Sequence, residues 1–194
     1  DLFFAQAIKW LESQRSSGKP FFAYITPNAA HGPLVVPKEY YQQYEDKVPE
    51  QVAKFYGMIE NVDTNFGKLL AKLREWGIEN NTLVVFLTDN GGTAGVKTFN
   101  AGMRGAKGTP YQGGTRVPSF WRWPAGFQGG IDCKALSAHI DILPTMADIL
   151  GVPLDGDLRT QVEGKSLLPL LKNPSAQWPD RFLVTHVGRW PHGK

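Results

Sequence analysis

Four polar side chains lie in segments whose composition suits the binding of an anion and catalysis on it: His31, Asp89, Asn90 and Lys107. Asp89 and Asn90 are adjacent, and a carboxylate beside an amide offers the oxygen ligands that a hard cation such as calcium or magnesium prefers. Lys107 lies further along in a glycine-rich basic stretch. A cation site near a Lys and a His suits a reaction on a tetrahedral oxyanion ester, because the metal and the Lys offset negative charge while the His donates to an oxygen.

The Asp-Asn-Gly-Gly segment at residues 89–92 also has a purely structural interpretation. Asn-Gly and Gly-Gly are ordinary turn dipeptides, and taken alone a polar turn is the commoner explanation. Its position favours a ligand site, because it follows the apolar run of residues 82–88. A run with no polar alternation is typical of a strand buried on both faces, and ligands bind at the carboxyl ends of such strands.

The elements around these residues predict an α/β fold with a mostly parallel sheet flanked by helices. Apolar residues recur at helical spacing over residues 2–14 and 52–76, and the helix from 52 should stop at Gly77. Strands are expected at residues 20–27 and 82–88, which places His31 just past the end of the first one. Helix and strand thus alternate as they do in parallel sheets with crossover helices.

The rest of the chain predicts one domain over residues 1–194. Residues 91–114 form a long stretch with no period, and loops of that length are usually functional. Beyond it, strands are expected at 116–123 and 181–186. Helices are expected at 141–150, with Pro144 in the first turn and Gly151 at the end, and at 166–171.

Composition excludes several classes of protein. The 194 residues carry a formal net charge of +3, with basic and acidic residues interspersed, so nucleic acid is not the indicated partner. No apolar segment reaches the roughly 20 residues that a membrane span needs. The single cysteine, Cys133, identifies no redox compartment, and nothing in the sequence indicates an oligomeric state.

The order and spelling of the motifs closely resemble the type I sulfatase family, of the alkaline phosphatase-like superfamily. The matching segments span nearly the whole chain in the family's order: Phe21-Phe-Ala-Tyr24, His31-Gly-Pro33, Tyr56-Gly-Met-Ile-Glu60, Asn81-Thr-Leu-Val-Val-Phe-Leu-Thr-Asp89-Asn-Gly-Gly92, Met103-Arg-Gly-Ala-Lys107-Gly-Thr-Pro-Tyr-Gln-Gly-Gly114-Thr-Arg-Val-Pro118, His139-Ile-Asp141 and Gly164-Lys-Ser-Leu-Leu-Pro169.

The resemblance implies roles for the four residues. Asp89 and Asn90 match the family's second pair of calcium ligands, with magnesium as the other candidate ion. Lys107 matches the lysine that contacts the sulfate, and His31 the histidine that hydrogen-bonds a sulfate oxygen. The implied substrate is a sulfate ester of a small molecule or glycan, and the implied compartment is periplasmic, secreted or lysosomal. Four further charged residues fall in family motifs, and structural roles are expected for them: Asp63, Arg104, Arg116 and Asp141.

The chain departs from the family pattern in two places. Gln112 stands where the family usually has Glu, and a neutral amide would weaken a pairing with a loop arginine. The Cys/Ser-x-Pro-x-Arg segment that supplies the family's formylglycine nucleophile is absent, and Cys133 lacks the proline and arginine of that motif. We therefore expect a middle portion of a sulfatase catalytic domain, with the formylglycine upstream and this chain alone inactive.

Two other functions stay open from the residues. A phosphomonoester or phosphonate hydrolase of the same superfamily would use the same metal and lysine chemistry. A noncatalytic anion- or carbohydrate-binding module could stack sugars on Trp121, Trp123 and Trp190. For the tryptophans in the run of residues 120–123, packing across the two faces of a sheet is the favoured interpretation.

Overall fold

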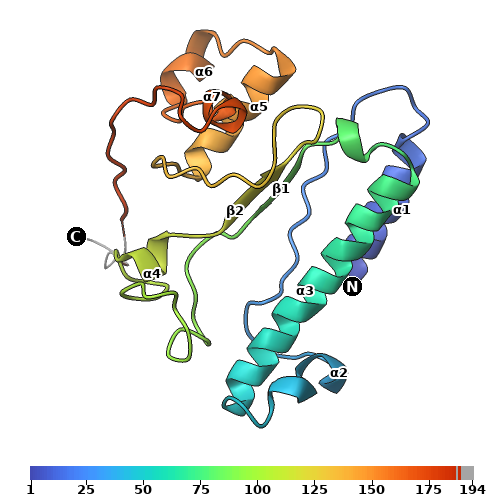
Figure 1. Ribbon diagram of the computed structural model, residues 1–194, viewed down its shortest axis with the longest axis vertical. Coiled ribbons are helices and arrows are strands. Elements are labelled where there is room, and N and C mark those ends of the chain that lie inside the picture. Colours follow the sequence, from blue (N-terminus) through green and yellow to red (C-terminus); the bar gives the residue numbers. More distant parts are fainter. Residues whose placement is uncertain (187, 189–194) are drawn as a thin grey trace, which may run out of the picture. The chain divides into compact units, whose positions relative to one another are not determined.

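The computed structural model describes residues 1–186 and residue 188, and the chain divides into two compact units. The first unit comprises residues 1–79 and 88–117, and the second comprises residues 80–87 together with the chain from Pro118 onward. In chain order (Figure 1), the elements are α1 (Leu2–Gln14), α2 (Lys38–Tyr41), the 3-10 helix η1 (Gln42–Tyr44), α3 (Glu50–Glu75), η2 (Glu79–Asn81), β1 (Val84–Leu87), α4 (Gln112–Thr115), β2 (Ser119–Arg122), η3 (His139–Asp141), α5 (Ile142–Leu150), α6 (Gly156–Gln161) and α7 (Leu168–Lys172).

Two helices carry the core of the first unit. The predictions of helices at 2–14 and 52–76 are confirmed by α1 and by the 26-residue α3. Their apolar faces meet in a cluster of buried side chains, formed by Phe4 and Leu11 from α1 and Leu69 from α3. The last turn of α3 carries Lys72 and Arg74, which complement the negative end of the helix dipole.

The sheet of the second unit differs from the mostly parallel sheet that the sequence predicts. β1 and β2 confirm the strands expected near 82–88 and 116–123, but they pair antiparallel, with Val84 opposite Arg122 and Leu87 opposite Ser119. A parallel partner needs a crossover connection, usually an α-helix. The segment between β1 and β2 contains only the four-residue α4, so no long helix returns the chain to the starting edge.

The strand predictions for residues 20–27 and 181–186 are wrong, because neither segment forms a ladder. Residues 20–27 nevertheless share one property with a strand, because packed and exposed side chains alternate along them. Phe21 and Ile25 pack against the α1–α3 core, whereas Phe22 and Tyr24 are 76% and 84% exposed. The alternation of apolar side chains therefore reports one packed face, while a strand also needs a hydrogen-bonded neighbour.

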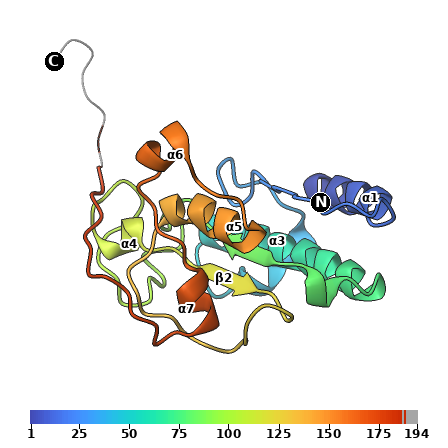
Figure 2. The same ribbon diagram turned by 90° about the horizontal axis from the view of Figure 1, so that it is seen from above.

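The second unit is built around α5 and α7, which pack together (Figure 2). Pro144 lies in the first turn of α5 and Gly151 closes it with a φ of 64°, as predicted. Leu170 of α7 and Ala147 of α5 are buried. Across the part of the chain that the structure covers, no helix is both long and apolar enough to cross a membrane.

Candidate active site

The Asp89–Asn90 turn follows β1 directly along the chain, where the sequence predicts it. Asp89 is exposed and Asn90 is half-buried. The Asn90 side-chain nitrogen donates to the carbonyl oxygen of Gly91 at 2.9 Å. Because this bond uses the side-chain nitrogen, the side-chain oxygen of Asn90 remains available to bind a cation.

Glycines join this turn to the basic stretch downstream. The Gly91 amide donates to the Gly114 carbonyl at 3.0 Å, and the Gly113 amide donates to the Arg104 carbonyl at 2.7 Å. A Cβ added to Gly91 would overlap the backbone of Gly113, and one added to Gly113 would overlap the Gly105 carbonyl. The two backbone segments approach so closely that no side chain fits between them.

Lys107 lies in a tight turn that is hydrogen-bonded to Gly92, the residue after the Asp89–Gly91 segment. Its backbone amide donates to the Gly92 carbonyl at 3.0 Å, and the Thr109 amide closes the turn onto Ala106 at 3.0 Å. Gly108, the third residue of the turn, has a φ of 85°, the left-handed conformation that a turn of this kind requires at that position. The structure therefore brings the Lys107 backbone to the residue that follows the Asp89–Gly91 segment.

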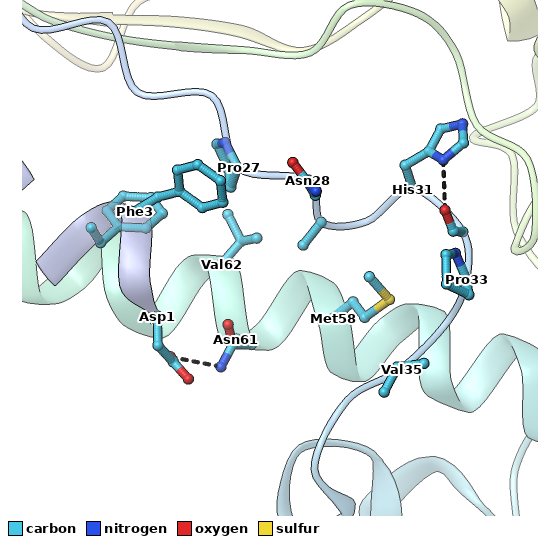
Figure 3. A pocket seen from close by; sticks show the side chains of 13 residues that line it. Asp1, Phe3, Pro27, Asn28, His31, Pro33, Val35, Met58, Asn61 and Val62 are labelled. Atoms are coloured by element: carbon cyan, nitrogen blue, oxygen red, sulfur yellow. Dashed lines mark hydrogen bonds between the residues drawn. The ribbon is translucent and has the colours of Figure 1, made fainter. Parts of the chain in front are cut away.

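His31 lies in the segment of residues 27–35, next to the start of α1 and the middle of α3. It lines a cavity of about 340 Å³, shown in Figure 3, between the start of α1, residues 27–35 and the middle of α3. Met58 and Val62 of α3 form an apolar side of this cavity, and Asp1 accepts a hydrogen bond from Asn61 at 3.1 Å. The His31 Nδ1 lies 2.8 Å from the Gly32 carbonyl, to which it donates.

This hydrogen bond has a chemical consequence for His31. Because a carbonyl only accepts, Nδ1 carries the hydrogen and Nε2 is the nitrogen left for a ligand. Donation from Nε2 to an anionic oxygen then requires the imidazolium form. Within the described part of the first unit, no hydrogen bond joins His31 to Asp89, Asn90 or Lys107.

The segment that contains Lys107 is rich in basic residues and has no acidic ones. The segment of residues 91–116 contains no Asp or Glu and four basic residues, which are Lys97, Arg104, Lys107 and Arg116. None of the four forms an ion pair within the first unit. Exposed cations without a carboxylate partner suit an anionic ligand.

Arg104 has an aromatic partner in place of a carboxylate. Its guanidinium carbon lies 3.6 Å from the ring centre of Tyr111, and Nη2 donates to the Tyr111 hydroxyl at 2.6 Å. Gln112 stands at the family's Glu position and, being neutral, cannot form an ion pair with Arg104. The expected structural role for Arg104 is thus met by stacking, which holds the guanidinium and leaves its charge in place.

Asp141 has the structural role that the sequence predicts. Its side chain is fully buried and forms a bidentate ion pair with Arg181, with contacts of 2.9 and 2.5 Å. The backbone amides of Ala138 and Lys165 also donate to it, each at 2.8 Å. Burial raises the pKa of this carboxyl, but the hydrogen bonds from Arg181, Lys165 and Ala138 outweigh it and leave the pKa below its ordinary value.

Trp121 lies in β2, and Trp123 follows the end of that strand, so the predicted packing of this pair across the two faces of a sheet is not confirmed. Trp123 stacks edge-on against Phe127 and lies over Gly126. The Trp121 ring nitrogen donates to the Ser119 hydroxyl at 2.9 Å. Trp190 lies outside the described residues.

Sequence reasoning missed two residues of the basic loop. The Asn100 side-chain nitrogen donates to the carbonyls of Met103 and Gly105, each at 2.8 Å, and the Thr109 hydroxyl donates to the Ala106 carbonyl at 2.8 Å. Asn and Thr between glycines are typical of any loop, so their type and spacing gave no signal. Only the cluster of glycines at Gly91, Gly105 and Gly113 hinted at a close backbone approach.

Comparison with known proteins identifies the class to which this loop and fold belong. A family model described as "Sulfatase" matches residues 1–152, so the chain belongs to the sulfatase family. It is 30% identical to the Uncharacterized sulfatase YdeN of Escherichia coli (strain K12), over 95% of this chain and 33% of that protein. It is 29% identical to Arylsulfatase H of Homo sapiens, over 98% of this chain and 34% of that protein. The chain thus spans about a third of the length of the curated relatives it matches.

Solved structures place the chain in the α/β fold of alkaline phosphatase-like sulfatases. The crystal structure of Ps i-CgsB in complex with k-i-k-neocarrahexaose aligns with a TM-score of 0.82 and 28% identity, over 90% of this chain and 39% of that chain. The putative sulfatase yidJ from Bacteroides fragilis aligns with a TM-score of 0.77 over 91% of this chain and 41% of that chain. At 20% identity, the second structure supports the fold alone.

Proposed function

We propose that the protein containing this chain hydrolyses sulfate esters, and that residues 89–116 supply its anion-binding wall. One observation carries the proposal. The Lys107 amide is bonded to the Gly92 carbonyl, which ties a lysine to the turn that begins with Asp89 and Asn90. Membership of the sulfatase family and the absence of acidic residues from positions 91–116 support the same reaction class.

Asp89 and Asn90 would hold a calcium ion. Their donor set fits that ion, because one side chain offers a carboxylate and the other an amide oxygen whose nitrogen is already engaged by Gly91. Calcium takes six to eight oxygen ligands, so these two residues would supply part of the shell. Magnesium could be held by the same pair with more water in its shell.

Lys107 and His31 would act on the charge of the sulfate group. The Lys107 ammonium, held by a backbone that is bonded on both sides, would stabilise negative charge as it develops on the sulfuryl and leaving oxygens. His31 would donate from Nε2 to an oxygen of the sulfate. When present, the metal would supply further positive charge and the formylglycine, which we place outside this chain, would supply the nucleophile.

The substrate class that we favour is a sulfated carbohydrate. Ps i-CgsB, the relative with a TM-score of 0.82, was solved in complex with k-i-k-neocarrahexaose. Another neighbour, BT4656, aligns with a TM-score of 0.55 and was solved in complex with D-glucosamine-2-N,6-O-disulfate. Four unpaired cations between residues 97 and 116 would suit such an anionic substrate.

The test uses the complete protein that contains this chain, with the 194-residue chain measured beside it. We expect hydrolysis of a chromogenic aryl sulfate by the complete protein, loss of activity with a calcium chelator and recovery when calcium is added. Mass spectrometry of the active protein should find formylglycine outside residues 1–194. A folded complete protein that is inactive on aryl and glycan sulfates, with calcium present, would overturn the proposal.

A second candidate function is the hydrolysis of phosphonate or phosphate monoesters. The phosphonate monoester hydrolase SpPMH from Silicibacter pomeroyi aligns with a TM-score of 0.52 and 25% identity, over 84% of this chain and 34% of that chain. A lysine and a divalent cation stabilise either tetrahedral anion. Parallel assays on p-nitrophenyl sulfate and a phenylphosphonate ester decide between them by the ratio of kcat/KM.

A further inference from the structure

The turn that carries Lys107 is held by side-chain hydrogen bonds to the backbone, made by Thr109 and Asn100. The Thr109 hydroxyl donates to the Ala106 carbonyl at 2.8 Å and accepts from the Ala106 amide at 3.2 Å. Together with the Thr109 amide, which bonds the same carbonyl, these contacts close the four residues around Lys107. Thr109 thus fixes both polar groups of the residue that precedes the lysine.

A second anchor lies on the other side of the lysine. Asn100 is half-buried, and its side-chain nitrogen bridges the carbonyls of Met103 and Gly105 at 2.8 Å each. The Met103 amide returns a bond to the Asn100 carbonyl, also at 2.8 Å. Since Gly105 has a φ of 82° and is two residues before Lys107, this bridge holds the chain in the conformation that leads into the turn.

We propose that Thr109 and Asn100 are positioning residues for Lys107. This inference rests on the proposed function of Lys107 as the group that stabilises sulfate charge. The stretch of residues 100–109 is exposed or half-buried and has no helix or strand of its own, so side-chain bonds replace regular structure there. Lysine has four rotatable bonds, and a fixed backbone limits where its ammonium can lie.

The proposal is tested by a double-mutant cycle in the complete protein. Thr109→Val keeps the shape of the side chain and removes its hydroxyl, and Thr109→Ser keeps the hydroxyl. We expect Thr109→Val to lower kcat for an aryl sulfate about tenfold with less change in KM, and Thr109→Ser to restore most of the loss. In a Lys107→Ala background, Thr109→Val should lower kcat less than twofold, because the group that it positions is gone.

Asn100 is tested by the same cycle with Asn100→Leu, which removes the donor that bridges the two carbonyls and adds no charge. Inorganic sulfate binding, measured by calorimetry, gives a second readout, and we expect the effect of either change on the Kd to vanish in the Lys107→Ala background. Thr160→Val is the matched control. The Thr160 hydroxyl makes a similar local bond to Asp157 at 2.8 Å in α6, so this change should leave kcat and the sulfate Kd unaltered.

The outcomes separate this inference from the proposed function. If Lys107→Ala itself leaves kcat unchanged, the proposed role of Lys107 fails and this inference fails with it. If Lys107→Ala strongly lowers kcat but Thr109→Val and Asn100→Leu lower it by the same factors with and without Lys107, the two residues act on general structure. The positioning inference is then overturned while the proposed function stands. Loss of kcat with Thr109→Ser equal to that with Thr109→Val would overturn it as well.

Discussion

Two charged regions of this molecule use basic residues in opposite ways. In the second unit, Arg181 is 8% exposed and is matched to the fully buried Asp141 by two hydrogen bonds. In the first unit, residues 91–116 carry four basic residues with no acidic neighbour in the segment, and Arg104 and Lys107 are exposed.

The difference separates charges that hold the fold from charges left available to a ligand. A buried ion pair makes its hydrogen bonds within the protein, and removal of one partner leaves an uncompensated buried charge. The basic segment obtains its order from glycine backbone contacts and from Asn100 and Thr109, so its charges need no protein partner. We therefore expect substitutions in the buried pair to lower stability and substitutions in the basic segment to lower activity, and the predictions below test this difference.

The largest effect is expected from Asp141→Ala. Without the carboxylate, Arg181 is buried unpaired and the amides of Ala138 and Lys165 lose their acceptor. The free energy of unfolding should fall by about 3–5 kcal/mol, as measured by urea denaturation. The exposed pair of Arg74 with Glu79 is the control, because Arg74→Ala should cost less than about 1 kcal/mol. A loss no larger than that of the control would contradict the structural role.

Lys107→Ala should produce the reverse pattern. Removal of one preorganised charge-stabilising group typically costs about two to three orders of magnitude in kcat. The free energy of unfolding should change by less than about 0.5 kcal/mol, because Lys107 is exposed and forms no ion pair in its unit. Equal losses of stability and turnover would remove the distinction between the two regions.

Gly113→Ala should damage the basic segment through its backbone. The added methyl group would overlap the Gly105 carbonyl, and the Gly113–Arg104 hydrogen bond would have to open. We expect a loss of more than about 1 kcal/mol in stability together with reduced sulfate binding. Gly67→Ala is the matched control, since nothing lies near a Cβ on that exposed position of α3, and it should stabilise by about 0.5–1 kcal/mol. The prediction fails if the two variants unfold alike.

The smallest effect concerns pH and sharpens the account of Asp141. Because the pKa of this carboxyl is lowered in the folded protein, its contribution to stability is present above the ordinary aspartate value of about 3.9 and is lost as pH falls through the folded value. The stability difference between the wild type and Asp141→Asn should be constant from about pH 5 to 7 and should shrink below about pH 4. A difference that holds at lower pH would show that the carboxylate charge contributes nothing.

Helices α1, α3 and α5 were predictable from sequence because each carries its signal locally, whereas the short α2, α4 and α6 were not predicted. The apolar spacing of α1 and α3, and Pro144 and Gly151 at the ends of α5, depend only on nearby residues. The strand at residues 20–27 and the parallel sheet were not, because strand pairing depends on a neighbour that periodicity does not reveal. The same limit explains why two strands of similar apolar character, β1 and β2, gave no sign of their antiparallel direction.

The candidate site was predictable in its residue types and only partly in its geometry. Motif order pointed to Asp89, Asn90 and Lys107, whose segments the structure joins through Gly92. It also pointed to His31, which lies on the wall of the cavity beside α3. Asn100 and Thr109 could not be found in this way, because their role consists of hydrogen bonds to carbonyls that every residue type presents.

The absence of acidic residues from positions 91–116 has a consequence for how fast a ligand arrives. Unpaired cations on an exposed segment raise the rate at which anions diffuse to it, and dissolved salt screens this attraction over a Debye length of about 8 Å at physiological ionic strength. Association should therefore slow as salt is added, and more steeply for a highly sulfated oligosaccharide than for a simple aryl sulfate. The segment would thus favour highly sulfated substrates through a faster association rate, before any contact with Lys107 is made.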